Sequence, residues 1–252
     1  IAIQTNTPKE TGEITISFIG AGSYAQGNLL PNLPKNKHVQ NIGICTNSGT
    51  TSKRVAEKFG FQYALADVQS IINKETNTVF IATKHNTHAK YVIDCLKAKK
   101  NVFVEKPLCL DEKELKQIQD LYTSGDNQLM VGFNRRFAPL AITLKTKLHN
   151  APVSIIYRIN AGYIPKESWL QDIEIGGGRI IGEVCHFLDF VIWLIGSQIN
   201  KVQCFSIEDP NSFHDTISIN LQFVNGSIAT IHYFSNGPKS LPKEYIEVYQ
   251  SG

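Results

Sequence analysis

Short apolar runs alternate with longer amphipathic stretches over the first half of the chain. The apolar runs predict strands over 14–19, 39–45, 78–82, 101–104 and 129–133, and helical periodicity predicts helices over 23–33, 51–59, 67–73, 87–99 and 111–123. Asp67 and Asp111 stand at helix N-cap positions, and Glu114 follows Asp111 as in a capping box. Buried strands that alternate with helices favour a parallel sheet covered on both faces. The pattern therefore predicts an α/β fold whose first part is a doubly wound, Rossmann-type domain.

The regular alternation of predicted strands and helices ends after about residue 136. A helix, a strand over 153–160, a glycine-rich loop and a long apolar helix precede strands near 202–207, 216–223 and 227–234. The pair Asn225-Gly226 between two alternating runs is a strong hairpin signal. These features predict two domains, 1–135 and 136–252, the second an α+β domain built on an antiparallel sheet.

Composition narrows the class of protein. Hydrophobic residues make up 42% and charged residues 19% of the chain, which is an ordinary globular composition. The net charge of +3 arises from 25 basic and 22 acidic residues without a basic stripe, so no nucleic-acid partner is expected. The apolar run 187–195 is shorter than the roughly 20 residues of a membrane span. Five widely spaced cysteines predict reduced thiols and a cytoplasmic location.

A glycine pattern follows the first predicted strand of the Rossmann-type domain. Gly20-Ala21-Gly22-Ser23-Tyr24-Ala25 lies between a strand and a helix, which is the context that a dinucleotide phosphate loop requires. Gly20 would permit the tight turn, Gly22 would let the backbone approach the pyrophosphate, and Ala25 would replace the third glycine. An incidental glycine-rich turn is the alternative.

The end of the second strand bears on the choice between NAD and NADP. It reads Cys45-Thr46-Asn47-Ser48, without the carboxylate that holds the ribose 2′-hydroxyl in NAD-specific sites. Ser52, Lys53 and Arg54 follow, where a hydroxyl and cations could meet a 2′-phosphate. NADP is therefore expected to be tolerated, although the two cations could equally be a solvated helix face.

Several motifs agree in order with one known superfamily. Val104-Glu105-Lys106-Pro107-Leu108 resembles the signature of the glucose-fructose oxidoreductase, inositol dehydrogenase and rhizopine-catabolism (Gfo/Idh/MocA) superfamily. Further matching blocks are 18–22, 81–83, His88-Ala89, 131–137, and the triple glycine 176–178 that leads to His186 and Asp189. Segments 134–139, 161–165 and 178–186 resemble a subgroup fused behind an alcohol-dehydrogenase-like domain. The chain, which starts at Ile1 and stops just after a strand-like segment, is accordingly expected to be a fragment.

The resemblance implies an NAD(P)-dependent oxidoreductase that moves a hydride between nicotinamide and a CH–OH group of a sugar, sugar nucleotide or polyol. It implies catalytic roles for Lys106 and His186. Glu183 and Asp189 stand three residues before and after His186, so either carboxylate could share its helix face and orient the imidazole, and Glu183 is the third expected catalytic residue. It also implies a homo-oligomer formed through the sheet of the second domain. With the glycine motif, it gives as expected cofactor-binding residues Gly20, Gly22, Ser23, Tyr24, Ala25, Thr46, Asn47, Ser52, Thr83, His85, His88, Glu105 and Lys106.

The chain departs from the superfamily pattern at two places. Many members carry an aspartate four residues before the histidine, where this chain has Gly182. Glu183 could replace it, although an offset of one residue turns an α-helix by about 100°. Lys84-His85 stands where Pro-Asn is usual, beside the nicotinamide ribose.

The substrate pocket is expected to include arginine and aromatic side chains, which suit phosphate, carboxylate and sugar faces. The candidates are Arg136, Arg158, Tyr163, Trp169, Arg179 and Asp189. Glu183-x-x-His186 resembles half of a carboxylate-bridged metal motif, but no second copy is evident, so no metal is predicted. Two other functions stay open: a non-catalytic dinucleotide-binding domain of a larger protein, and a reductase of a non-sugar substrate such as an imine or a pyrrole.

Overall fold

The computed structural model describes residues 2–4, 14–208, 213–238 and 240–251. The chain separates into two compact units, Ile1–Gly132 and Phe133–Gly252. The sequence predicted a domain boundary between residues 135 and 136.

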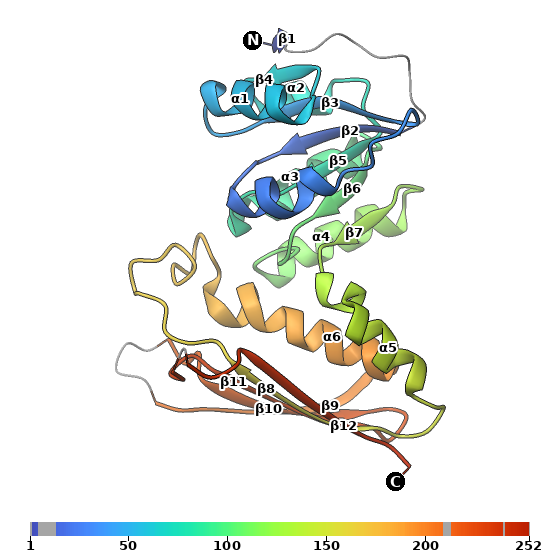
Figure 1. Cartoon of the computed structure of the whole chain (residues 1–252), viewed down its shortest axis with the longest axis vertical. Coiled ribbons are helices and arrows are strands. Elements are labelled where there is room, and N and C mark those ends of the chain that lie inside the picture. Colours follow the sequence, from blue (N-terminus) through green and yellow to red (C-terminus); the bar gives the residue numbers. More distant parts are fainter. Residues whose placement is uncertain (1, 5–13, 209–212, 239, 252) are drawn as a thin grey trace. The chain divides into compact units, whose positions relative to one another are not determined.

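The first unit is built on a seven-stranded sheet (Figure 1). In sheet order the strands are β1 (Ala2–Gln4), β4 (Tyr63–Leu65), β3 (Val39–Cys45), β2 (Ile14–Ile19), β5 (Thr78–Ile81), β6 (Asn101–Val104) and β7 (Leu129–Val131). All neighbouring pairs are parallel except β1–β4 at the edge. Because the chain winds outward from β2 in both directions, this is the predicted doubly wound fold. The short strands β1 and β4 were not predicted.

The helices of the first unit cover both faces of this sheet. They are α1 (Gly49–Phe59), α2 (Val68–Ile72), α3 (His88–Lys97), α4 (Glu112–Thr123) and the short helical segments η1 (Ala25–Leu29), η2 (Leu30–Asn32) and η3 (His85–Thr87). Phe18 packs in a core with Val55 of α1, whereas the next strand residue, Ile19, packs in a second core with Val92 of α3. Successive strand residues point to opposite faces, so each strand contributes to both cores.

Helix caps form where the sequence placed them. The carboxylate of Asp111 accepts a hydrogen bond from the backbone N–H of Glu114 at 2.8 Å, and the Glu114 carboxylate accepts one from Leu110 N–H at 3.0 Å. Asp67 accepts from the N–H of Ser70 at 2.7 Å. Each cap satisfies an N–H group that a helix start leaves without an intrahelical partner.

The second unit contains a five-stranded sheet in the order β12 (Glu244–Tyr249), β8 (Ser154–Asn160), β11 (Ile228–Phe234), β10 (Ile217–Phe223) and β9 (Ile199–Ser206). The predicted hairpin connects β10 and β11 through Gly226, whose φ is +86°. The prediction of an antiparallel sheet was wrong in one pairing, because β8 and β11 run parallel and the sheet is mixed. Alternation fixes which face a residue occupies but carries no information on which distant strand lies alongside.

One face of this second sheet is covered, and no described helix of the second unit packs on the other, which we call the open face. Helix α6 (Cys185–Ile195) lies across the covered face, where Phe187 and Val191 pack against Ile219, Ile231 and other inward residues of the strands (Figure 1). The remaining helical segments of this unit are η4 (Asn134–Phe137), α5 (Pro139–Lys147) and η5 (Ile180–Val184). The exposed large apolar side chains of the open face are Ile156, Phe205, Ile228, Tyr245 and Tyr249.

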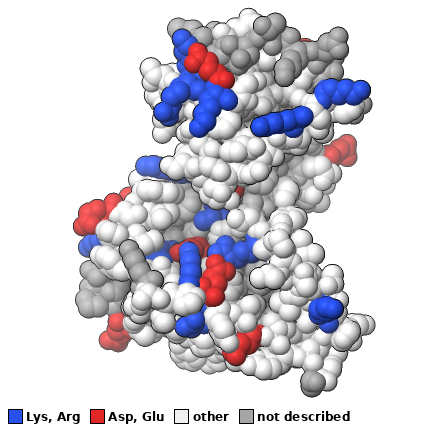
Figure 2. All heavy atoms as spheres, in the orientation of Figure 1, with Lys and Arg blue, Asp and Glu red and all other residues white. Residues whose placement is uncertain are grey.

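Three further properties follow from the described residues. None of their helices is long and apolar enough to cross a membrane. All five cysteines are free thiols. Within each unit, the face seen in Figure 2 carries both basic and acidic side chains. On α1, Lys53 pairs with Glu57 one turn further along at 4.0 Å.

Candidate functional site

The glycine loop lies at the carboxyl end of β2. Gly20 has a φ of +88°, and a Cβ at this position would lie 2.3 Å from the carbonyl oxygen of Ala82. A side chain is therefore excluded both by backbone conformation and by the close approach of the β5 end. At Gly22 the opposite holds, because a Cβ would meet no heavy atom within 4 Å.

This loop has the properties of a cradle for a pyrophosphate. Ser23 and Tyr24 open the helical segment and are exposed, whereas Ala25 is buried against the sheet at 1% exposure. Backbone N–H groups at a helix start attract phosphate oxygens, and the open space at Gly22 allows them a close approach. The residues present thus fit a bound dinucleotide.

The turn after β3 is held by its own hydroxyl groups. The buried Ser52 hydroxyl accepts a hydrogen bond from the N–H of Thr46 at 2.9 Å and lies 3.0 Å from the Thr46 hydroxyl. Asn47 is exposed beside them. Ser52 therefore stabilises the turn. Asn47 is accessible for its predicted contact with the ribose of the dinucleotide.

The segment after β5 brings three predicted residues together. The hydroxyls of Thr83 and Thr87 lie 2.6 Å apart, and His85 is buried at 5% exposure. The fully buried His88 ring lies between two backbone carbonyls: Nδ1 is 2.7 Å from Pro107 O, and Nε2 is 3.2 Å from Thr83 O. His88 therefore joins the β5 end to the segment that contains Lys106.

Glu105 and Lys106 follow β6, and both are half-buried. A Cβ on Gly132 would lie 2.9 Å from Glu105 Oε1, so the carboxyl group packs on the backbone that leaves β7. Burial raises the pKa of Glu105 to about 6, although the charge of Lys106 acts in the opposite direction. Because β2, β5 and β6 are adjacent and parallel, the glycine loop, Thr83 and Lys106 share one edge of the sheet.

In the second unit, His186 lies in the first turn of α6 at 8% exposure, with its ring 6.2 Å from that of Phe133 in an edge-to-face arrangement. The two carboxylates that the sequence placed near it have other partners. The Asp189 carboxylate accepts a hydrogen bond from Arg136 Nε at 2.6 Å and a second hydrogen bond from Nη2 of the same guanidinium. Arg136 and Asp189 therefore bind each other.

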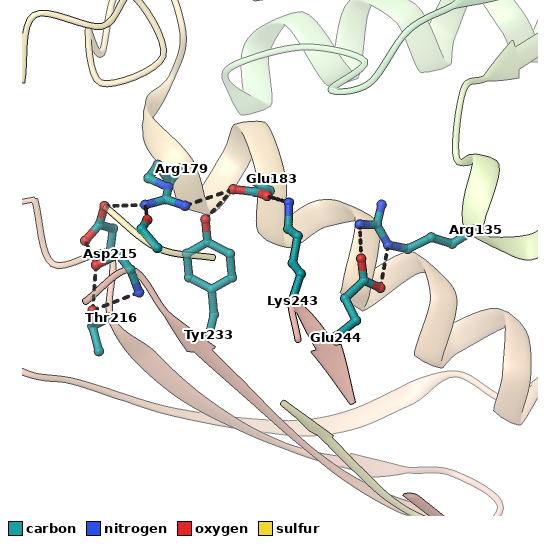
Figure 3. Close-up of polar contacts among 10 residues, drawn as sticks. Arg135, Arg179, Glu183, Asp215, Thr216, Tyr233, Lys243 and Glu244 are labelled. Atoms are coloured by element: carbon teal, nitrogen blue, oxygen red, sulfur yellow. Dashed lines mark hydrogen bonds and ion pairs between the residues drawn. The ribbon is translucent and has the colours of Figure 1, made fainter. Parts of the chain in front are cut away.

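Glu183 is the centre of a polar network (Figure 3). Its carboxylate accepts hydrogen bonds from Lys243 Nζ at 2.6 Å, Arg179 Nη2 at 3.2 Å and the Tyr233 hydroxyl. Burial alone would raise the pKa of Glu183, but the hydrogen bonds from Lys243 and Tyr233 and the nearby cations lower it to about 2. Glu183 lies in a π-helical turn, η5, so the offset of 100° per residue assumed from the sequence does not apply there.

Arg179 and Tyr163 line a cavity of about 220 Å³ in the second unit. The other four predicted pocket residues, Arg136, Arg158, Trp169 and Asp189, are not among the described residues that line it. Arg158 lies on the open face of the sheet, with its guanidinium 5.6 Å from the centre of the Tyr245 ring. Trp169 is 36% exposed in the loop that precedes η5.

Sequence reasoning missed several members of the polar networks. They are Arg135, Asp215, Tyr233, Lys243 and Glu244, and Arg135 binds Glu244 through Nε at 3.1 Å and Nη2 at 2.7 Å. These residues are far from their partners in sequence, so local patterns carry no signal for the contacts. The inward position of Tyr233 on its alternating strand was the one available indication.

The doubly wound sheet, the glycine loop at its carboxyl edge and the adjoining Lys106 segment define a dinucleotide-binding α/β protein. Residues 14–133 match the family described as "Oxidoreductase family, NAD-binding Rossmann fold", and residues 151–251 match the "GFO/IDH/MocA C-terminal domain". The chain belongs to the Gfo/Idh/MocA family of NAD-binding oxidoreductases, as the sequence motifs indicated.

Similar curated proteins include the uncharacterized oxidoreductase YrbE of Bacillus subtilis, which is 24% identical over 229 residues, covering 88% of this chain and 67% of that protein. The myo-inositol 2-dehydrogenase of Thermotoga maritima is 30% identical over 153 residues, covering 60% of this chain and 46% of that enzyme. The chain thus spans between about half and two thirds of the length of these relatives.

Solved structures share the fold. Levoglucosan dehydrogenase in complex with NADH and L-sorbose superposes with a TM-score of 0.80 at 22% identity, covering 94% of this chain and 71% of that chain. A 3-ketoreductase from Actinomadura kijaniata in complex with NADP gives a TM-score of 0.77 at 17% identity, covering 89% of this chain and 71% of that chain.

Proposed function

We propose that this protein is an NAD(P)-dependent dehydrogenase or reductase that transfers a hydride between nicotinamide and a CH–OH carbon of a sugar or polyol. The observation that carries the proposal is the shared sheet edge, where the open loop at Gly22 adjoins the segment of Lys106. The names of the similar proteins, inositol and levoglucosan dehydrogenases among them, support the substrate class. A bound nicotinamide would supply the hydride acceptor or donor.

Lys106 and His186 are the proposed catalytic residues. Oxidation of a CH–OH group requires a group that removes the hydroxyl proton, and a half-buried lysine next to the cofactor loop can hold or orient that hydroxyl. His186 is the proposed general base. Glu183 is ionised and held by three donors, so we assign it a positioning role.

Either dinucleotide is proposed to bind. Thr46 and Asn47 stand where NAD-specific sites carry a carboxylate, and Arg54 is exposed on the first turns of α1, where it could meet a 2′-phosphate. The solved relatives include complexes with NADH and with NADP. The affinities of Arg54→Ala for NADH and NADPH are compared with those of the unaltered chain. If Arg54 contacts the 2′-phosphate, its removal should weaken the binding of NADPH and leave that of NADH unchanged.

The catalytic proposal is tested by separating binding from turnover. NADH and NADPH are titrated into the chain by fluorescence, and oxidation of myo-inositol and D-glucose is followed by NAD(P)H absorbance. We expect Lys106→Met and His186→Asn to lose turnover by about a hundredfold or more, and His186→Asn to retain dinucleotide binding. Lys113→Met, an exposed lysine on α4, is the matched control and should retain both.

The two alternative functions give different outcomes. A non-catalytic dinucleotide-binding domain would bind NADH without turning over any substrate. A reductase of imines or pyrroles would oxidise NADPH with those substrates and would not oxidise the polyols.

Self-association through the open face of the second sheet is a further part of the proposal. Phe205, Ile228, Tyr245 and Tyr249 are each more than half exposed on that face, and exposed apolar patches of this kind mark association sites. Sedimentation velocity should show a dimer or larger oligomer that Tyr245→Lys dissociates, while Tyr122→Lys on α4 should leave it intact. The free cysteines fit the cytoplasm as the proposed location.

A further inference from the structure

The first unit has a pocket of about 270 Å³ near the amino ends of its strands, away from the edge proposed to hold the dinucleotide. Its described walls come from the segment 30–35, from Asn41 of β3 and from the last two residues of α1, Lys58 and Phe59. Asn41 lies about 13 Å along β3 from Cys45, at roughly 3.3 Å per residue. None of the described lining residues is among those expected to contact the dinucleotide.

The walls of this pocket are mostly apolar. Leu30 and Leu33 are buried at 2% and 8% exposure, and the exposed Pro31 and Pro34 line the pocket beside them. Phe59 is half-buried and supplies an aromatic surface on which a ligand ring can pack. Pockets for drug-sized ligands measure roughly 300–1,000 Å³, so this smaller volume suits one ring with short substituents.

Positive charge stands at the rim of the pocket. Lys35 and Lys58 are the charged residues among its described lining, and both are exposed. Neither lysine takes part in the ion pairs of the described residues, and Lys58 Nζ lies 5.0 Å from the centre of the Phe59 ring. The C-terminal end of α1 carries about half a negative charge, which two ammonium groups exceed. The rim therefore favours an anion.

Asn41 adds one polar group to the apolar walls. Its Nδ2 donates a hydrogen bond to the carbonyl oxygen of Phe59 at 3.1 Å. Its Oδ1 is buried and has no donor among the residues that the structure describes. A buried acceptor without a donor is costly, so a ligand hydroxyl that donates to Oδ1 would remove that cost.

We propose that this pocket binds a small aromatic carboxylate that also carries a hydroxyl group. The carboxylate lies at Lys35 and Lys58, the ring packs against Phe59, and the hydroxyl is directed to Asn41. The inference goes beyond the proposed hydride transfer and is independent of it. Because the pocket and the dinucleotide site share no described residue, both ligands can be bound at the same time.

Ligand-observed NMR titration of the full chain tests the proposal with 4-hydroxyphenylacetate as the probe. The probe should bind saturably. Its analogue 4-hydroxyphenethyl alcohol replaces the carboxylate by a hydroxymethyl group, and phenylacetate lacks the ring hydroxyl. Each analogue should bind at least about threefold more weakly, because each loses one of the two polar contacts.

Variants locate the bound probe. The double variant Lys35→Met/Lys58→Met keeps the apolar stems of both side chains and should weaken the probe by about threefold or more. Lys113→Met, an exposed lysine on α4 outside the pocket, is the matched control and should bind the probe as the unaltered chain does. Saturating NADH should not displace the probe.

The Gly22→Trp variant separates this proposal from the proposed function, since it should lose NADH binding and retain the probe. An unaltered chain that binds the probe but no dinucleotide would contradict the proposed function alone. The pocket proposal would be overturned by any of four results: no saturable binding, equal affinity for either analogue, unchanged affinity in the double lysine variant, or displacement of the probe by NADH.

Discussion

The imidazole of His88 lies 2.7 Å from the carbonyl oxygen of Pro107, although 19 residues separate them in sequence. The other ring nitrogen lies 3.2 Å from the carbonyl oxygen of Thr83. His88 begins α3 and is fully buried, so it connects the segments that follow β5 and β6. Lys106 is therefore held in place by a residue that has no need to contact a ligand.

His88→Asn should reduce the free energy of unfolding by about 1–3 kcal/mol at pH 7, because a buried carbonyl loses its partner. Burial lowers the pKa of His88 below its usual value of 6.5, against the smaller opposite effect of the two carbonyls. The unfolded chain then binds the proton more readily, so stability is fully present above pH 6.5 and decreases as pH falls below it. Urea unfolding between pH 5 and 8 measures this dependence.

The pH dependence should be weaker in His88→Asn than in the unaltered chain. His38, which is exposed, offers a matched control in His38→Asn. An unchanged pH slope in His88→Asn would contradict the assigned cause.

Two glycines two residues apart should respond differently to the same substitution. Gly20→Ala places a Cβ 2.3 Å from Ala82 O at a φ of +88°, so it should destabilise the chain by about 1–3 kcal/mol. Gly22→Ala meets open space and should change stability by less than about 0.5 kcal/mol. It should nevertheless weaken NADH binding, since the Cβ enters the space proposed for the pyrophosphate.

Thermal unfolding and NADH titration of both glycine variants separate the two effects. If Gly22→Ala binds NADH as well as the unaltered chain does, the pyrophosphate does not approach the backbone at that residue.

Glu183→Gln should destabilise the chain by about 2 kcal/mol at pH 7, a value reduced for the partial exposure of the carboxylate. The pKa of Glu183 in the folded chain is lowered to about 2 from 4.5. A carboxyl group with a lowered pKa contributes stability above pH 4.5 that is lost as pH falls toward 2. The difference between the two proteins should therefore shrink when urea unfolding is repeated near pH 3.

A matched control for Glu183→Gln is Glu112→Gln, which changes an exposed carboxylate at the start of α4. If the difference in stability between the unaltered chain and Glu183→Gln stays the same at acid pH, Glu183 does not stabilise the chain through its ionised carboxylate.

The first unit could be predicted almost strand by strand because its signals are local. Phe18 and Ile19 point to opposite cores, and a short run of mostly apolar residues encodes that arrangement within a few positions. The parallel pairing of β8 with β11 depends on segments about 70 residues apart, for which periodicity gives no indication. The bond from Tyr233 to Glu183 was missed for the same reason. The glycine loop could be recognised in the sequence because the positive φ at residue 20 favours glycine there.

Glu105→Gln should stabilise the chain at neutral pH by about 1–2 kcal/mol, because the substitution removes a charge from a poorly solvated place. Burial raises the pKa of Glu105 in the folded chain to about 6, from 4.5. The folded chain therefore binds the proton more readily between these values, and the stability of the unaltered chain decreases as pH rises from 4.5 to 6. The two proteins should be nearly equal in stability at pH 4 and should differ at pH 7, as measured by urea unfolding. The opposite pattern, with the variant less stable at pH 7, would mean that the ionised carboxylate is stabilised through Lys106 more than burial penalises it.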